Sequence, residues 1–139
     1  MQTVILAGGF GTRLAEETSL RPKPMVEIGD RPILQHIMEI YAGQGHRDFI
    51  VALGYLGHMI KRHFMDWRDM GGDLAIDFGT GALGRDGEPP HDWRVQLVET
   101  GTETQTGGRV KRLKAVLRGR CVAMTRHRLC SWRLRKIRS

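Results

Sequence analysis

A glycine-rich turn near the start of the chain, in the sequence VILAGGFGTRL, ends on an arginine. Glycine has no Cβ atom, so Gly8, Gly9 and Gly11 allow backbone N–H groups to approach a ligand closely. Successive amides of this kind form an anion-binding nest, to which Thr12 adds a hydroxyl and Arg13 a permanent positive charge. The turn predicts binding of a phosphate or a nucleotide. A tight turn that needs glycine for its geometry alone is the alternative.

A second cation follows this turn. The spacing G-G-x-G differs from the dinucleotide fingerprint G-x-G-x-x-G, and no lysine follows at the spacing of a P-loop. In the sequence RPKPMVEIG, however, Pro22 and Pro24 restrict the backbone on either side of Lys23. We expect Arg13 and Lys23 to contact one polyphosphate, and the alternative for Lys23 is a solvated surface position.

The apolar pattern of the first half of the chain predicts a parallel α/β arrangement. Residues 3–8 form a short continuous apolar run, which is typical of a strand buried on both faces. Helical spacing follows over residues 32–45, then a second buried strand over 48–55 and helical spacing again over 57–67. The order strand, helix, strand, helix is that of a right-handed parallel unit.

The second half has a weaker pattern. We expect strands over residues 74–79 and 93–101, with a loop over 79–92 between them. A polar loop, TETQTGGR over residues 102–109, precedes a short helix predicted over 110–117. From Arg118 onward the sequence shows neither an apolar face nor turn residues.

Composition places the chain among globular proteins and separates its last residues from the rest. Its 139 residues suit one domain, and shares of 40% apolar and 27% charged residues exclude a disordered chain. No apolar run reaches the roughly 18 residues that span a bilayer, so we expect a cytoplasmic protein without a membrane partner. Residues 117–139 contain eight cations and no anion, and removing these eight from the net charge of +7 leaves about −1 for residues 1–116. We therefore divide the chain into a nucleotide-binding part, 1–116, and a basic tail, 117–139, that is non-native or irregular.

The histidines do not predict a metal site. His58 and His63 are five residues apart, and a helical zinc pair needs a spacing of four. His36 lies beside the apolar stripe of its predicted helix, and we expect it to be a hydrogen-bonded structural residue. Both cysteines lie in the basic tail, so the predicted core has no cysteine ligands for zinc.

Several separated motifs together resemble a known family. The sequence LAGGFGTRL followed by RPKPMVEIGDRPILQHIM resembles the signature of the sugar-phosphate nucleotidyltransferases. The sequences EETSLRPKPMVEIG and VETGTETQTGGRVKRL are similar to the glucose-1-phosphate cytidylyltransferase branch of that family. The resemblance covers residues 1–116. It implies an α/β, Rossmann-like nucleotidyltransferase fold, with a mostly parallel sheet flanked by helices, that is incomplete at its C-terminal side.

The resemblance also implies a reaction. In this family CTP condenses with α-D-glucose 1-phosphate to give CDP-glucose and pyrophosphate, a step of nucleotide-sugar biosynthesis for lipopolysaccharide O antigen. The sugar phosphate attacks the α-phosphorus in line, while Mg²⁺ and basic side chains stabilise the charge that develops. Positioning and electrostatics dominate such transfers, and no protein nucleophile is required.

The site residues follow from the resemblance by position. It implies nucleotide contacts from Leu6, Ala7, Gly8, Gly9, Phe10, Gly11, Thr12, Arg13, Lys23, Thr104 and Arg109. Arg13 and Lys23 would be the catalytic residues: Arg13 would stabilise the transition state and the leaving pyrophosphate, and Lys23 would hold phosphate oxygens. Thr104 and Arg109 would reach the base and the phosphates. The alternative for Arg109 is a place in a basic surface turn.

The chain departs from the family where the metal ligand is expected. The resemblance implies Mg²⁺, held by an aspartate in a GDG-like strand end that follows the helix after TETQTGGR. In this chain Glu103 is the last acidic residue, and the corresponding stretch reads MTRHRLCSW. The expected carboxylate ligands of Mg²⁺ are thus missing, and arginines cannot replace them. The alternative function is a catalytically impaired, nucleotide-binding fragment.

The basic tail allows two interpretations. Loss of acidic residues together with loss of similarity indicates a shifted reading frame or a truncated gene product. The weaker alternative is a basic arm that binds nucleic acid through phosphates, with Trp132 as a stacking group. An incomplete sheet also leaves a strand edge uncovered, so self-association into a homo-oligomer is compatible with the sequence.

Overall fold

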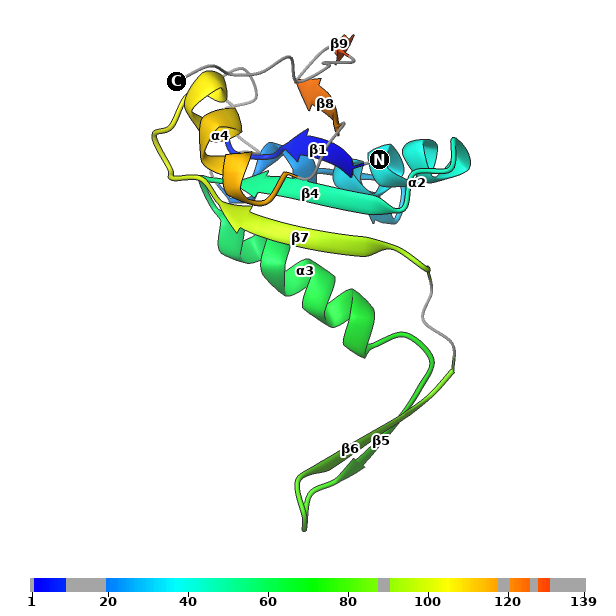
Figure 1. The fold of residues 1–139 in the computed structure, drawn as a ribbon. Helices are drawn as coiled ribbons and strands as arrows, with labels where there is room; N and C mark the ends of the chain where they lie inside the picture. The colour runs from blue at the N-terminus through cyan, green and yellow to red at the C-terminus, as the bar shows by residue number, and fades with distance from the viewer. Residues whose placement is uncertain (1, 10–19, 88–90, 118–120, 126–127, 131–139) are drawn as a thin grey trace.

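A computed structural model describes residues 2–9, 20–87, 91–117, 121–125 and 128–130 (Figure 1). The central element is a five-stranded sheet in the order β7-β4-β1-β8-β9. Its strands are β1 (Gln2–Leu6), β4 (Asp48–Leu53), β7 (Arg94–Glu99), β8 (Cys121–Thr125) and β9 (Arg128–Cys130). All neighbouring pairs are parallel except β8 with β9. The strands predicted over 3–8, 48–55 and 93–101 are confirmed as β1, β4 and β7.

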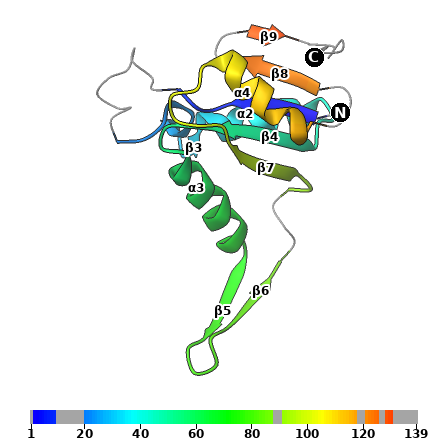
Figure 2. The same ribbon diagram turned by 60° about the vertical axis from the view of Figure 1, so that its left-hand side comes forward.

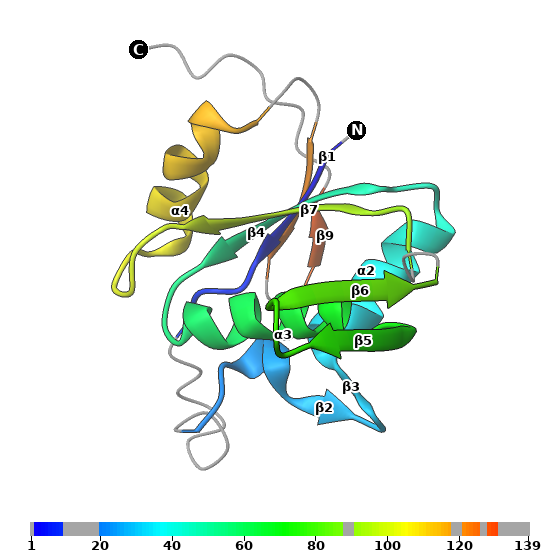
Figure 3. The same cartoon turned by 90° about the horizontal axis from the view of Figure 1, so that it is seen from below.

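Helices cover both faces of this sheet, as the view from below shows (Figure 3). On one face lie α2 (Ile33–Gly43) and α3 (Gly57–Asp69), which confirm the helices predicted over 32–45 and 57–67. The opposite face carries α4 (Thr106–Arg112) and the short helix η2 (Leu113–Ala115). The arrangement is a three-layer α/β/α fold, which confirms the predicted fold class.

Side chains of β4, an inner strand of the sheet, alternate between two cores. Phe49, Val51 and Leu53 belong to the cluster under α2 and α3. Ile50 and Ala52 pack with Leu113 of η2 on the other face. Because both faces of the strand are buried, its sequence is continuously apolar rather than alternating.

A short segment connects the glycine-rich turn to α2. It consists of the 3-10 helix η1 (Lys23–Met25) and the two-residue strands β2 (Glu27–Ile28) and β3 (Arg31–Pro32). Pro22 and Met25 are buried on either side of Lys23, and Met25 joins the core beneath α2. The segment that carries Lys23 is therefore fixed to the body of the protein at both ends.

A hairpin arm extends away from the body (Figures 1 and 2). It is formed by β5 (Asp73–Asp77) and β6 (Ala82–Asp86), which pair antiparallel. The strand predicted over 74–79 is confirmed, whereas the prediction of a loop over 79–92 is wrong at β6. The residues of β5 are exposed on both faces. Without a buried face there is no alternation of apolar residues from which β6 could be predicted.

One further expectation differs from the structure. The helix expected over 110–117 begins at Thr106, inside the segment that the sequence predicts as a polar loop. Gly107 and Gly108 are poor helix formers, and the residue that α4 buries is an arginine, so no apolar stripe marks its first turn. In the basic tail, the structure places β8 beside β1. Within the described ranges no helix is long and apolar enough to span a membrane.

Candidate functional site

The carboxyl ends of β1, β4 and β7 lie together at one edge of the sheet. The strands are parallel, and the last register pairs join Leu6 to Ala52 and Leu53 to Glu99. Gly8, Gly54 and Thr100 follow the ends of these three strands within two residues. Open α/β sheets bind ligands outside the carboxyl ends of their strands, so this edge is the expected place for a site.

Arg109 of α4 reaches over this edge and is buried there, with 3% of its surface exposed. Its Nη1 donates to Leu53 O at 3.0 Å and to Thr100 Oγ1 at 2.7 Å, and its Nη2 donates to Thr102 O at 3.3 Å. A guanidinium keeps its charge when buried, so these acceptors hold a positive charge at the carboxyl edge. The alternative of a basic surface turn is wrong for Arg109.

Two glycines make room for this guanidinium. A Cβ atom at either Gly8 or Gly54 would collide with Arg109 Nη1. Arg109 therefore lies directly against the backbone that leaves β1 and the backbone that leaves β4. Gly8 belongs to the glycine-rich turn, so the structure brings together two of the predicted site residues that are about a hundred positions apart in the chain.

Thr104 lies on the loop between β7 and α4, beside the same edge. It is half-buried between Gly101, whose φ of 92° requires glycine, and Gly108 of α4. Arg112, one helical turn after Arg109, donates through Nη1 to Thr100 O. The loop is thus tied to α4, and Thr104 is held near Arg109.

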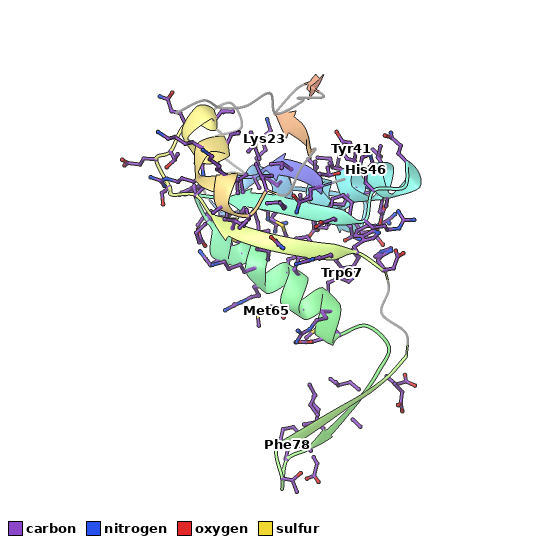
Figure 4. The ribbon with its side chains drawn as sticks, in the orientation of Figure 1. Lys23, Tyr41, His46, Met65, Trp67 and Phe78 are labelled. Carbon is purple, nitrogen blue, oxygen red and sulfur yellow. The ribbon has the colours of Figure 1, made fainter. Side chains whose placement is uncertain are left out.

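Lys23, labelled in Figure 4, is half-buried and lies between the buried residues Pro22 and Met25. Among the predicted residues of the turn, Ala7 is buried and its N–H donates to Ala52 O at 3.0 Å, which extends the pairing of β1 with β4. The predicted residues Phe10, Gly11, Thr12 and Arg13 lie outside the described residues. The convergence of Arg13 with Lys23 therefore stays a prediction.

The structure adds three groups that the sequence motifs did not indicate. These are Gly54, the hydroxyl of Thr100 and the carbonyl of Leu53, all of which surround the Arg109 guanidinium. One signal for them was present in the sequence. Gly54 and Thr100 are each the second-to-last residue of a predicted strand, over 48–55 and 93–101, and α/β sheets bind ligands at the ends of their strands.

The side chains that the structure describes at this edge do not fit a Mg²⁺ ion. Glu99, at the end of β7, forms an ion pair with Lys61 at 2.6 Å. The next strand in the chain, β8, has the sequence CVAMT and contains no carboxylate. In the part of the chain that the structure describes, no cluster of three or more histidine, cysteine or acidic side chains could hold a metal ion. Magnesium prefers carboxylate oxygens, and this edge offers cations instead.

Two histidines have structural surroundings. His36 Nε2 donates to Ile28 O at 2.9 Å, which confirms the expected hydrogen-bonded role. His63 lies among the aromatic rings of α3, and burial lowers its pKa.

A mostly parallel sheet flanked by helices, with a buried arginine at the carboxyl edge where such sheets bind ligands, defines an α/β protein. The model of the family described as "Nucleotidyl transferase" matches residues 2–113, and the chain belongs to this family. The family consists of enzymes that transfer nucleotidyl groups.

The chain is similar to curated proteins named glucose-1-phosphate cytidylyltransferase. It is 46% identical over 113 residues to the protein from Salmonella typhimurium, which covers 81% of this chain and 44% of that protein. It is 44% identical over 114 residues to the "Probable glucose-1-phosphate cytidylyltransferase" of Bacillus subtilis, which covers 82% of this chain and 44% of that protein. The chain thus spans less than half the length of these relatives.

Two solved structures share the fold. HddC from Yersinia pseudotuberculosis, complexed with GMP-PN, aligns with a TM-score of 0.60 and 26% identity over 88% of this chain and 46% of that chain. A UDP-glucose pyrophosphorylase complexed with UDP-glucose aligns with a TM-score of 0.60 and 17% identity over 88% of this chain and 44% of that chain. The second similarity concerns the fold alone.

Proposed function

We propose that the chain binds CTP at the carboxyl edge of its sheet, as the nucleotide-binding part of a glucose-1-phosphate cytidylyltransferase. The observation that carries the proposal is the guanidinium of Arg109, buried directly against the backbone of Gly8 and Gly54. A fixed positive charge beside a glycine-rich turn suits a nucleoside triphosphate, whose phosphates need cations and backbone amides. The similarity to curated cytidylyltransferases supports CTP over other nucleotides.

In the proposed arrangement, the amides after β1 contact the base and the ribose. Arg13 and Lys23 contact the triphosphate, while Thr104 and Arg109 approach from the side of α4. The reaction is the condensation of CTP with α-D-glucose 1-phosphate, in which the sugar phosphate attacks the α-phosphorus and pyrophosphate leaves. The chain would contribute to it by positioning the nucleotide and by stabilising negative charge on the phosphates.

Calorimetric titration with CTP tests this site through Lys23. We expect Lys23→Ala to weaken CTP binding by about tenfold to a hundredfold, since a hydrogen bond to a charged group contributes about 1.5–3 kcal/mol. The matched control is Lys114→Ala, because Lys114 is an exposed lysine of η2 that is not among the predicted site residues. Equal affinities of the wild type and Lys23→Ala would contradict the assignment of Lys23.

The lack of a metal-binding cluster of carboxylates among the described residues of the carboxyl edge supports the alternative, a protein that binds the nucleotide but does not catalyse the reaction. Residues 104–139 contain no Asp or Glu, and β8 provides no carboxylate where the family resemblance implies the Mg²⁺ ligand. We expect the 139-residue chain alone to bind CTP but to release no pyrophosphate from CTP, glucose 1-phosphate and Mg²⁺. An assay of pyrophosphate release checks this, and turnover above that of a boiled sample would contradict it.

A further inference from the structure

We infer that Thr100 is a positioning residue, whose buried hydroxyl fixes the orientation of the Arg109 guanidinium in the nucleotide site. The inference deepens the proposed function and rests on it. Thr100 itself is assigned no contact with the nucleotide. Its role is to hold Arg109 in place before the ligand arrives.

The chemistry of the three groups fixes the direction of each hydrogen bond around the hydroxyl. Thr100 Oγ1 lies 2.6 Å from Leu53 O and 2.7 Å from Arg109 Nη1. A carbonyl oxygen only accepts and a guanidinium only donates. The hydroxyl must therefore donate its proton to Leu53 O, which leaves an oxygen lone pair directed at Arg109.

The hydroxyl can orient a side chain because Thr100 itself is firmly held. No part of Thr100 is exposed, and its N–H donates to Leu53 O at 3.0 Å, directly after the last register pair of β4 with β7. Its carbonyl accepts from Arg112. Thr100 thus joins the edge of the sheet to two arginines of α4, one through its hydroxyl and one through its carbonyl.

Leu53 O, which accepts from the Thr100 hydroxyl, has other hydrogen-bond donors. Leu53 O also receives hydrogen bonds from the Thr100 N–H and from Arg109 Nη1. Loss of the hydroxyl therefore removes one acceptor of Arg109 and leaves Leu53 O paired. A long side chain that is ordered before binding loses less conformational freedom when the ligand arrives, so its disorder would weaken binding.

The experiment compares Thr100→Val with Thr100→Ser in calorimetric titrations with CTP. Valine keeps the branched shape but has no acceptor, and we expect about tenfold weaker binding of CTP. Serine restores the hydroxyl, and we expect affinity close to that of the wild type. If Thr100→Val does not fold, Thr100→Ala carries the same comparison.

A double-mutant cycle separates positioning from a merely structural role. In an Arg109→Met background we expect Thr100→Val to cause no further loss of CTP affinity, because its effect acts through Arg109. An equal loss in both backgrounds, or wild-type affinity in Thr100→Val, would overturn the inference while leaving CTP binding itself intact. Absence of CTP binding by the wild type would instead overturn the proposed function, and the inference with it.

Discussion

Gly54→Ala is expected to weaken CTP binding by about tenfold or more while the chain remains folded. A Cβ atom at this position would collide with Arg109 Nη1, which is the end of a flexible side chain and can move away. The displaced guanidinium would lose its hydrogen bonds to Leu53 O and Thr100 Oγ1. We expect a loss of about 1–3 kcal/mol in the free energy of unfolding from these bonds. Calorimetry with CTP and urea denaturation measure the two effects.

Gly107→Ala is the matched control for this substitution. Gly107 lies in α4, the same helix as Arg109, and a Cβ atom there would meet nothing within 4 Å. We expect unchanged CTP affinity and a gain of about 0.4–1 kcal/mol in stability, because alanine favours a helix over glycine. Similar losses of affinity in Gly54→Ala and Gly107→Ala would contradict a specific contact between Gly54 and Arg109.

Phe49→Ala is expected to have the largest effect on stability, a loss of about 3–5 kcal/mol in the free energy of unfolding. Phe49 is fully buried in β4 and contacts Trp93, with ring centroids 5.4 Å apart. The substitution removes apolar contacts and leaves a cavity between the sheet and its helices. Because the total stability of a domain is about 5–15 kcal/mol, the loss is a large share of it. Urea denaturation followed by circular dichroism measures it.

Phe78→Ala provides the same chemical change at an exposed site. Phe78, at the tip of the hairpin arm, is 90% exposed and is labelled in Figure 4. We expect its substitution to change stability by no more than about 0.5 kcal/mol. A comparable loss in Phe49→Ala and Phe78→Ala would mean that the core does not lie between β4 and the helices packed on it.

The elements that sequence reasoning predicted are those with buried faces. β4 shows a continuous apolar run because Ile50 and Phe49 are buried on opposite faces of the sheet. The sequences of β6 and of the first turn of α4 show no comparable apolar pattern. The arm has no buried face, and the residue that α4 buries is Arg109, whose place depends on partners far away in the chain. Local patterns cannot indicate such partners.

In the candidate site, too, local sequence indicates some residues, while the roles of others depend on distant parts of the chain. The local sequence predicts an anion-binding turn, because glycine, threonine and arginine follow one another closely, and this stays a prediction. Thr104 and Arg109 followed only from resemblance to the family. The positions of Gly54 and Thr100 near predicted strand ends were a signal for a site, but their contacts with Arg109 could not be predicted. These contacts depend on the register of β4 with β7 and on the position of α4 above both strands.

The most direct test of the account is to map CTP onto the wild-type chain by ¹H–¹⁵N NMR. We predict that CTP shifts the amide signals of Gly8, Gly9 and Gly54 and the side-chain signal of Arg109, all at the carboxyl edge of the sheet. Shifts confined to the opposite end of the sheet, where the strands begin and His46 lies, would contradict the account. A spectrum that CTP leaves unchanged would also contradict it.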